Sequence, residues 1–138
     1  TWVFFGFTHC PDVCPGTLAA MRDTMPLIQG DKPGVLFISL DPERDTLDKL
    51  GEYTKWFNPS FEAATGDIPS LNKAAQAMGI AWSKVEDENS DNYQIAHTSW
   101  VILLNPSAQI QAWFSPPHLP QEMAQDFMAI RDNHQPAN

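Results

Sequence analysis

The stretch Trp2-Val3-Phe4-Phe5-Gly6-Phe7-Thr8-His9-Cys10-Pro11-Asp12-Val13-Cys14-Pro15 contains both cysteines of the chain. Its apolar, aromatic first half predicts a buried strand over residues 1–7. The segment from Pro15 predicts a helix over residues 15–28, whose inner face is Leu18, Met21, Met25 and Ile28. Both sulfurs are therefore expected at a strand-to-helix corner, where a helix N-terminus favours thiolate over thiol.

Strands and helices are predicted to alternate along the rest of the chain. Apolar runs predict strands over 34–40, 61–65, 80–85, 99–104 and 110–114, the last two joined by a turn at 105–108. Helices are predicted over 46–57, with Asp45 as N-cap, over 69–78, and from Pro120. The inward-facing residues are expected to be Leu47, Leu50, Tyr53 and Phe57 in the first of these helices and Met123, Phe127 and Ile130 in the last.

This order of elements predicts an α/β fold. Early strand–helix alternation implies parallel strands joined by helical crossovers, and the late hairpin implies an antiparallel edge. With a cysteine corner after the first strand, the pattern indicates a thioredoxin-like central mixed sheet flanked by helices on both faces. Residues 1–138 are expected to form a single soluble domain. Because the sequence begins inside a strand, it is also expected to be part of a longer protein.

The charge of the chain limits its partners. A formal net charge of −9 argues against nucleic acid or an anionic membrane as the main partner, since both require clustered Lys and Arg. The charge is compatible with a cationic partner or a metal cation, and equally with a role in solubility alone.

The two cysteines leave three interpretations: a redox pair, metal ligands, or unrelated core residues. Three residues separate Cys10 from Cys14, whereas a thioredoxin redox motif has two. The longer loop still permits a disulfide, and it also lets both thiolates face one ion. Two thiolates with a nearby imidazole would make a soft site suited to Cu(I). Spacing alone does not decide between redox and metal chemistry.

Other polar residues are weaker candidates. His97 begins a strand-like run, where a sheet edge could deliver a third ligand to the cysteine corner. His9 is expected to be an electrostatic neighbour or a packing residue, His118 to be exposed and structural, and His134 to lie in the tail. Asp12 fits a turn or cap role, with tuning of thiolate charge as the alternative.

The segment that follows the second predicted strand is acidic and contains one arginine. Its residues Asp41, Glu43 and Arg44 either face the cysteine corner, because they follow the carboxyl end of a strand, or form surface ion pairs.

Three blocks of sequence resemble the Sco/SenC family over most of the chain. They are residues 4–15, the run Ile38-Ser39-Leu40-Asp41-Pro42-Glu43-Arg44-Asp45-Thr46, and Tyr93 with His97-Thr98. The resemblance implies a thioredoxin-like copper chaperone whose copper ligands, for Cu(I) or Cu(II), are Cys10, Cys14 and His97. The chain departs from the family pattern at Ala96, where an acidic residue usually precedes the ligand histidine. Such a loss puts the strength of copper binding and the choice of client in question.

The resemblance also implies a biological setting. Family members help to build the binuclear copper site of cytochrome c oxidase, so the expected partner is its copper-bearing subunit or another periplasmic copper chaperone. The expected location is the periplasmic side of the bacterial inner membrane, through an N-terminal anchor. This anchor and the family's first hairpin are expected to be absent from the sequence. The alternative is an enzyme, a thiol–disulfide oxidoreductase with Cys10 and Cys14 as catalytic residues, which keeps client cysteines reduced.

Overall fold

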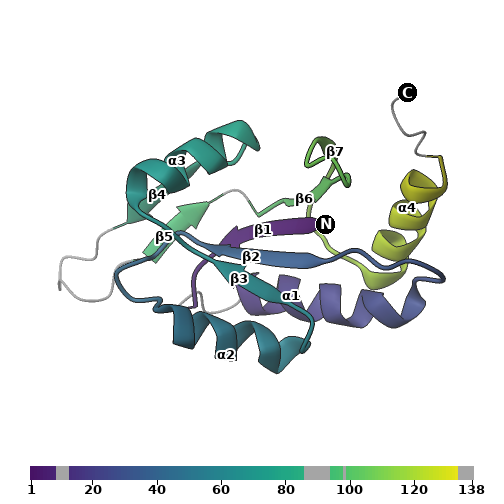
Figure 1. Ribbon diagram of the computed structural model, residues 1–138, viewed down its shortest axis with the longest axis horizontal. Coiled ribbons are helices and arrows are strands. Elements are labelled where there is room, and N and C mark those ends of the chain that lie inside the picture. The colour runs from purple at the N-terminus through teal and green to yellow at the C-terminus, as the bar shows by residue number, and fades with distance from the viewer. Residues whose placement is uncertain (9–12, 86–93, 98, 134–138) are drawn as a thin grey trace.

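A computed structural model describes residues 1–8, 13–85, 94–97 and 99–133, of which residues 13–14, 84–85 and 94–97 are described as backbone (Figure 1). Its strands are β1 (Trp2–Gly6), β2 (Val35–Ser39), β3 (Glu62–Ala64), β4 (Trp82–Val85), β5 (Gln94–His97), β6 (Val101–Leu104) and β7 (Ile110–Phe114). Its helices are α1 (Val13–Thr24), the 3-10 helix η1 (Met25–Leu27), α2 (Leu47–Phe57), α3 (Ile68–Ala77) and α4 (Pro120–Asn133).

The main sheet has five strands in the order β3-β2-β1-β6-β7. β1 pairs in parallel with β2, which pairs in parallel with β3, while β6 is antiparallel to both β1 and β7. The register places Phe4 of β1 beside Phe37 of β2 and Val101 of β6. The predicted mixed sheet with an antiparallel edge is therefore confirmed.

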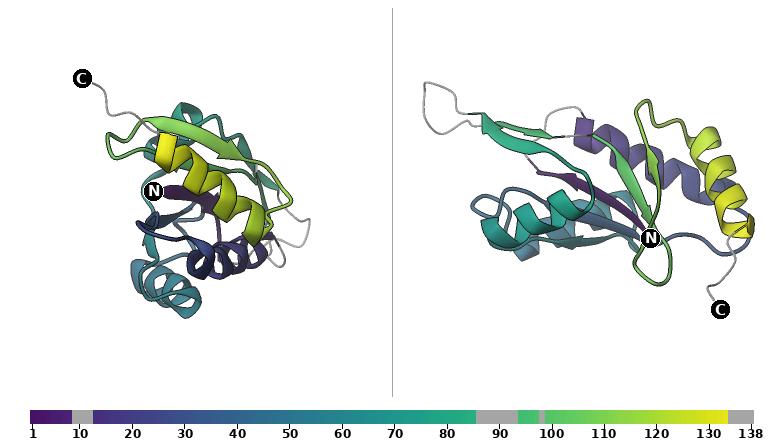
Figure 2. Two further views of the ribbon diagram at one scale, coloured as in Figure 1. Left: turned by 90° about the vertical axis from the view of Figure 1, so that its right-hand side faces the viewer. Right: turned by 90° about the horizontal axis from the view of Figure 1, so that it is seen from above.

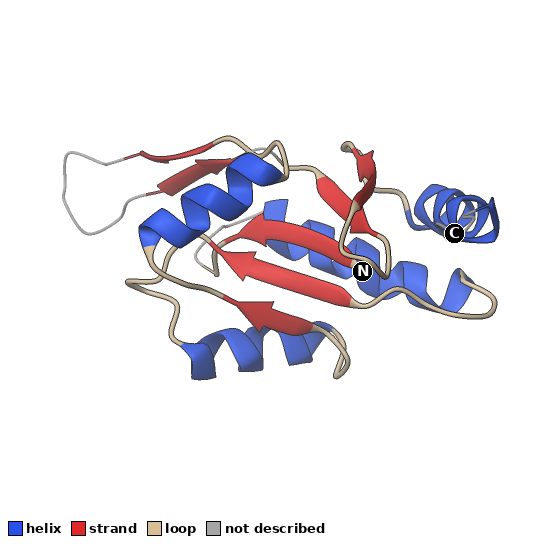
Figure 3. Cartoon of the chain, turned by 45° about the horizontal axis from the view of Figure 1, so that its top comes forward, coloured by secondary structure: helices blue, strands red, loops and turns tan. Residues whose placement is uncertain are grey.

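Helices flank this sheet. α1 and α2 contact each other and run along one face, whereas α3 lies across the other face (Figures 1 and 3). α4 packs against α1 and η1, at the end of the molecule opposite β5 (Figures 1 and 2). Within the part of the chain that the structure covers, no helix has the length and apolarity needed to cross a membrane.

Aromatic side chains pack in the core along β1, all five of whose residues are buried. On the α2 side, the ring of Phe37 lies 6.1 Å from that of Phe4 and 5.7 Å from that of Tyr53. Near α4, Trp2 makes edge-on contacts with Phe114 and Phe127, at 5.8 and 5.5 Å between centroids. Burial of such rings is a large favourable term in folding. The same apolar and aromatic residues are the reason why the sequence predicts a buried strand over residues 1–7.

Two helix predictions need correction at their N-termini. α1 begins at Val13, two residues earlier than predicted, so Cys14 belongs to the helix; α1 ends at Thr24 and η1 follows it. The predicted inner-face residues are all buried, although Met25 and Ile28 lie beyond α1. Thr46, not Asp45, caps α2 by accepting a hydrogen bond from the Lys49 N–H at 3.3 Å. Leu47 is 71% exposed, because the first turn of α2 extends past the core; its predicted inward orientation is wrong.

α3 begins close to the predicted position and has a side-chain cap. Asp67 accepts a hydrogen bond from the Ser70 N–H at 2.8 Å. The side chain and backbone of Ser70 lower the pKa of the Asp67 carboxyl. The helix ends before Gly79, which has a φ of +72° and suits a helix stop.

β4 and β5 form a separate two-stranded antiparallel sheet. The sequence predicts a strand over 80–85 but not β5, and it places His97 at the beginning of a strand. In the structure His97 is the last residue of β5 and pairs with Trp82, and β6 starts only at Val101. β5 is therefore an addition to the predicted strands, and the predicted β4 pairs with it instead of joining the main sheet.

Arg131 ties α4 to the loop after η1. Its Nη1 donates to the carbonyl oxygens of Gln29 and Asp31 at 2.6 and 2.8 Å. Arg131→Ala leaves both carbonyls without this charged donor and is expected to lower the free energy of unfolding by about 1–2 kcal/mol, measured by urea denaturation. The matched control Asp132→Ala removes only an exposed ion pair to Arg131 and should cost less than about 0.5 kcal/mol. Equal losses would contradict a role for the two carbonyl contacts.

Candidate metal centre

The structure confirms a strand-to-helix corner after β1. The strand ends at Gly6 and α1 begins at Val13, so Cys14 lies in the first turn of the helix. A helix N-terminus favours thiolate over thiol, so this position agrees with the expectation drawn from the sequence. Cys10 lies outside the described residues, as do His9 and Asp12.

His97 lies on a strand that contacts β1. β5 touches β1 without pairing with it, and Figure 1 shows it beside the carboxyl end of that strand. The β1–β6 register agrees, since Val101 begins β6 opposite Phe4 and the preceding chain approaches from the carboxyl end of β1. The backbone thus brings the strand that carries His97 to the end of β1 from which the chain leads to the cysteines.

A buried polar cluster, formed by Thr8, Ser39 and Asp45, lies at this same edge of the sheet. Asp45 Oδ2 accepts hydrogen bonds from the Thr8 N–H at 3.0 Å and from the Ser39 hydroxyl at 2.6 Å. Asp45 Oδ1 accepts a hydrogen bond from the Thr8 hydroxyl. Ser39 and Asp45 are almost fully buried, at 0% and 1% exposure. We refer to these three residues as the Thr8 clasp.

Asp41 and Arg44 flank the clasp, and Arg44 also contacts the residue that follows β1. The Arg44 Nε donates to Asp41 Oδ2, and the Arg44 guanidinium lies over the buried Phe7 ring at 5.9 Å. Asp41 is only 2% exposed, so the interpretation of this loop as surface ion pairs is wrong for that pair. Glu43 is exposed. The loop after β2 thus holds residues 7–8 through both Arg44 and Asp45.

The clasp is the part of the site that sequence reasoning missed. Asp45 was expected to cap α2, because an Asp directly before a helical pattern is a good N-cap. Its side chain turns instead to Thr8, which is distant in the sequence, and the adjacent Thr46 takes the cap. The only local sign of this role in the sequence is a second acidic residue four positions earlier, Asp41. The backbone carbonyl oxygen of Asp41 accepts a hydrogen bond from the Asp45 N–H at 2.9 Å.

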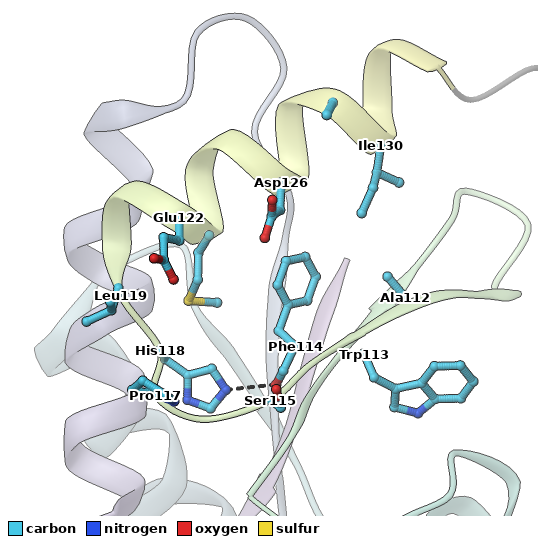
Figure 4. Close-up of a pocket in the computed structure, with 12 residues that line it drawn as sticks. Ala112, Trp113, Phe114, Ser115, Pro117, His118, Leu119, Glu122, Asp126 and Ile130 are labelled. Atoms are coloured by element: carbon cyan, nitrogen blue, oxygen red, sulfur yellow. Dashed lines mark hydrogen bonds between the residues drawn. The ribbon is translucent and has the colours of Figure 1, made fainter.

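His118 lies between β7 and α4, where it borders a cavity of about 370 Å³ (Figure 4). Its Nε2–H donates to the Phe114 carbonyl oxygen at 2.9 Å. It is half-buried rather than exposed as predicted, and this bond supports the predicted structural role. Glu122 and Asp126 also line the cavity. His134 lies outside the described residues.

No other metal centre competes with the cysteine corner in the described ranges, where no three His, Cys, Asp or Glu side chains are grouped to hold an ion. The candidate donors are those that the resemblance to the Sco/SenC family implies, Cys10, Cys14 and His97. Two thiolates and one imidazole fit copper, which soft sulfur ligands select, better than Mg²⁺ or Ca²⁺, which prefer oxygen ligands. The donor set also falls short of the four protein ligands of a structural zinc site.

Curated proteins with similar sequences are Sco proteins. "Protein SCO1 homolog 1, mitochondrial" of Arabidopsis thaliana is 34% identical over 122 residues, which are 86% of this chain and 36% of that protein. "SCO2-like protein RC0895" of Rickettsia conorii is 32% identical over 124 residues, 88% of this chain and 60% of that protein. The chain thus spans between about a third and three fifths of the length of these relatives.

Solved structures give the same result. Arabidopsis thaliana ScoI with copper bound has a TM-score of 0.86 and 31% identity, covering 96% of this chain and 84% of that one. Bradyrhizobium japonicum ScoI with copper bound has a TM-score of 0.81 and 31% identity, covering 94% and 83%. BsSco, described as a member of the Sco family of cytochrome c oxidase assembly proteins, is 19% identical with a TM-score of 0.69, covers 96% and 80%, and shows the fold alone.

The match to a family is almost as long as the chain. The family model described as SCO1/SenC covers residues 1–131, which include both cysteines, the Thr8 clasp and His97. With the thioredoxin-like fold and the similar Sco structures, this establishes that the chain is a member of the SCO1/SenC family.

Proposed function

We propose that this chain is a copper metallochaperone that binds copper through Cys10, Cys14 and His97. The observation that supports this most strongly is the contact between β5, which ends at His97, and β1, whose carboxyl end leads to the cysteines. Two related Sco structures, each 31% identical to the chain, contain copper, which supports copper as the ion.

Copper is the cargo in this proposal. The two thiolates supply soft ligands for Cu(I), and the imidazole adds a nitrogen donor that suits Cu(II) as well. The helix N-terminus favours the thiolate form of Cys14, which is the form that binds metal. Transfer proceeds by exchange of these thiolates for those of a partner. Oxidation of the two cysteines to a disulfide removes both sulfur ligands, so the redox state controls loading.

The proposed recipient is the copper-bearing subunit of cytochrome c oxidase, or another periplasmic copper chaperone that serves it. The chain either delivers copper to the binuclear site or prepares that site. The proposed location is the periplasmic side of the bacterial inner membrane, with the full-length protein held by an N-terminal anchor.

A thiol–disulfide oxidoreductase is the second candidate, favoured by the position of Cys14 in the first turn of α1. In that role Cys10 attacks a client disulfide, Cys14 resolves the mixed disulfide, and His97 is dispensable. The variant Cys14→Ser would then accumulate mixed disulfide with a client peptide that contains the two copper-site cysteines in oxidised form.

Anaerobic titration of the reduced chain with Cu(I), followed by spectra of the Cu(II) form, tests the proposal. We expect one tightly bound copper per chain and a thiolate-to-Cu(II) charge-transfer band that His97→Ala weakens or shifts. His118→Ala is the matched control, since His118 bonds to the Phe114 carbonyl instead, and its spectrum should match the parent's. Unchanged copper stoichiometry and spectra in His97→Ala would remove His97 from the ligand set. A chain that binds no copper would refute the function.

A further inference from the structure

The Thr8 clasp joins the carboxyl ends of two parallel strands. Thr8 follows β1, and Ser39 is the last residue of β2. The ladder between them continues past Gly6, whose carbonyl oxygen accepts the Leu40 N–H at 2.8 Å. Two residues further along, at Thr8, the Asp45 carboxylate accepts both the N–H and the hydroxyl. Thr8 is therefore held at its backbone and at its side chain by one buried group.

The carboxylate itself is held in place from several directions. The Ser39 hydroxyl donates to it and in turn accepts the Asp41 N–H at 3.1 Å. The Asp45 N–H donates to the Asp41 carbonyl oxygen at 2.9 Å, which folds the loop back toward β1. The Thr65 hydroxyl, just after β3, donates to the Ser39 carbonyl oxygen at 3.1 Å. Each of the three parallel strands thus contributes to a rigid support for Asp45.

Thr8 stands two residues before Cys10 in the sequence, and Cys14 follows in the first turn of α1. Residues outside the ligand shell that orient a metal ligand commonly raise its affinity for the metal. Thr8 and the start of α1 at Val13 are the described positions on either side of Cys10 in the sequence. Resting on the proposed copper function, we propose that Asp45 is a positioning residue that fixes Thr8 and thereby sets the geometry of the cysteine pair.

Asp45→Ala tests this in the folded, reduced chain, with Cu(I) as the probe in competition with a chromophoric chelator. Loss of all three hydrogen bonds should weaken Cu(I) affinity about 10- to 100-fold, as for other partners outside the ligand shell. Asp45→Asn should recover most of the affinity. Its carbonyl oxygen can accept from Thr8 N–H and Ser39, while its amide donates to the Thr8 hydroxyl oxygen.

Ser39→Ala is the matched control. It removes a buried hydrogen bond to the same carboxylate but leaves both contacts with Thr8. It should lose stability yet keep more of the copper affinity than Asp45→Ala. Equal affinity losses in the two variants, no rescue by Asp45→Asn, or parental affinity in folded Asp45→Ala would overturn the proposal. If Asp45→Ala does not fold, Thr8→Val decides. It lacks only the hydroxyl contact, and it too should bind Cu(I) more weakly; unchanged affinity would overturn the proposal.

A second measurement separates this inference from the copper function. In equilibrium with glutathione, the reduced cysteine pair passes two electrons to one glutathione disulfide, giving the Cys10–Cys14 disulfide and two glutathione thiols. Looser cysteines close less readily, so Asp45→Ala should shift this equilibrium toward the dithiol, whereas Ser39→Ala should shift it less. If the parent chain binds no copper, the copper function fails, and the equilibrium alone decides the positioning role. No shift in Asp45→Ala would refute it.

Discussion

Replacing Cys14 by serine is expected to weaken Cu(I) binding by about a hundred- to a thousand-fold, the share of one ligand in a typical protein metal site. A serine hydroxyl stays protonated at neutral pH and is a hard oxygen donor, so it does not replace a thiolate toward Cu(I). The substitution also prevents the disulfide. Chelator competition under anaerobic conditions measures the affinity. Among single substitutions of the proposed ligands, Cys14→Ser and Cys10→Ser are expected to cause the largest losses.

Gly16→Ala is the control for this experiment. It lies in the same first turns of α1, and a methyl group at this position would meet, apart from its own turn of helix, no atom of the described residues within 4 Å. Alanine favours a helix more than glycine does, so this variant should be as stable as the parent or more so, with unchanged copper affinity. Tight copper binding by folded Cys14→Ser would contradict the proposed ligand set, whatever the result for Gly16→Ala.

Phe4→Ala should cause the largest loss of stability. Phe4 is fully buried in the central strand, between its neighbours Phe37 and Val101. Removal of its ring leaves a cavity and is expected to cost about 3–5 kcal/mol. Since globular domains are stable by about 5–15 kcal/mol in total, much of the margin disappears. The midpoint of urea denaturation, followed by tryptophan fluorescence, measures the effect.

The matched comparison is Leu47→Ala, a large-to-small change on a side chain that is 71% exposed. It should change the free energy of unfolding by less than about 0.5 kcal/mol. If both substitutions had similar small effects, the central position of β1 in the core would be wrong.

The central sheet was predictable from the sequence because its strongest signals are local. β1 and β2 are short apolar runs next to glycines, prolines and polar turns, and their burial needs no long-range information. β5 was not predictable in this way. Its four residues, Gln94–His97, show no marked alternation of apolar and polar side chains, and they form a strand only because they pair with β4. The strand content of such segments comes from tertiary context rather than propensity.

The candidate site likewise has parts that the sequence predicts and parts that it does not. The spacing of the cysteines and their place before a helix are sequence features, and the resemblance to a family adds His97. Asp45 was interpreted from its immediate neighbours, where Asp and Thr are both good caps, and the choice between them depends on a contact with Thr8. That contact joins residues 37 positions apart, so no local pattern encodes it.

The β4–β5 hairpin has a consequence for how one site could serve two oxidation states of copper. It contacts β1 but belongs to a different hydrogen-bonded ladder, so movement of β5 along β1 breaks no backbone bond of the five-stranded sheet. In the proposed ligand set, His97 belongs to β5 of this separate ladder, whereas Cys14 belongs to α1. Cu(I) accepts low coordination numbers, whereas Cu(II) prefers a fuller tetragonal set of ligands. Movement of β5 away from the cysteines would therefore favour Cu(I), and movement toward them would favour Cu(II).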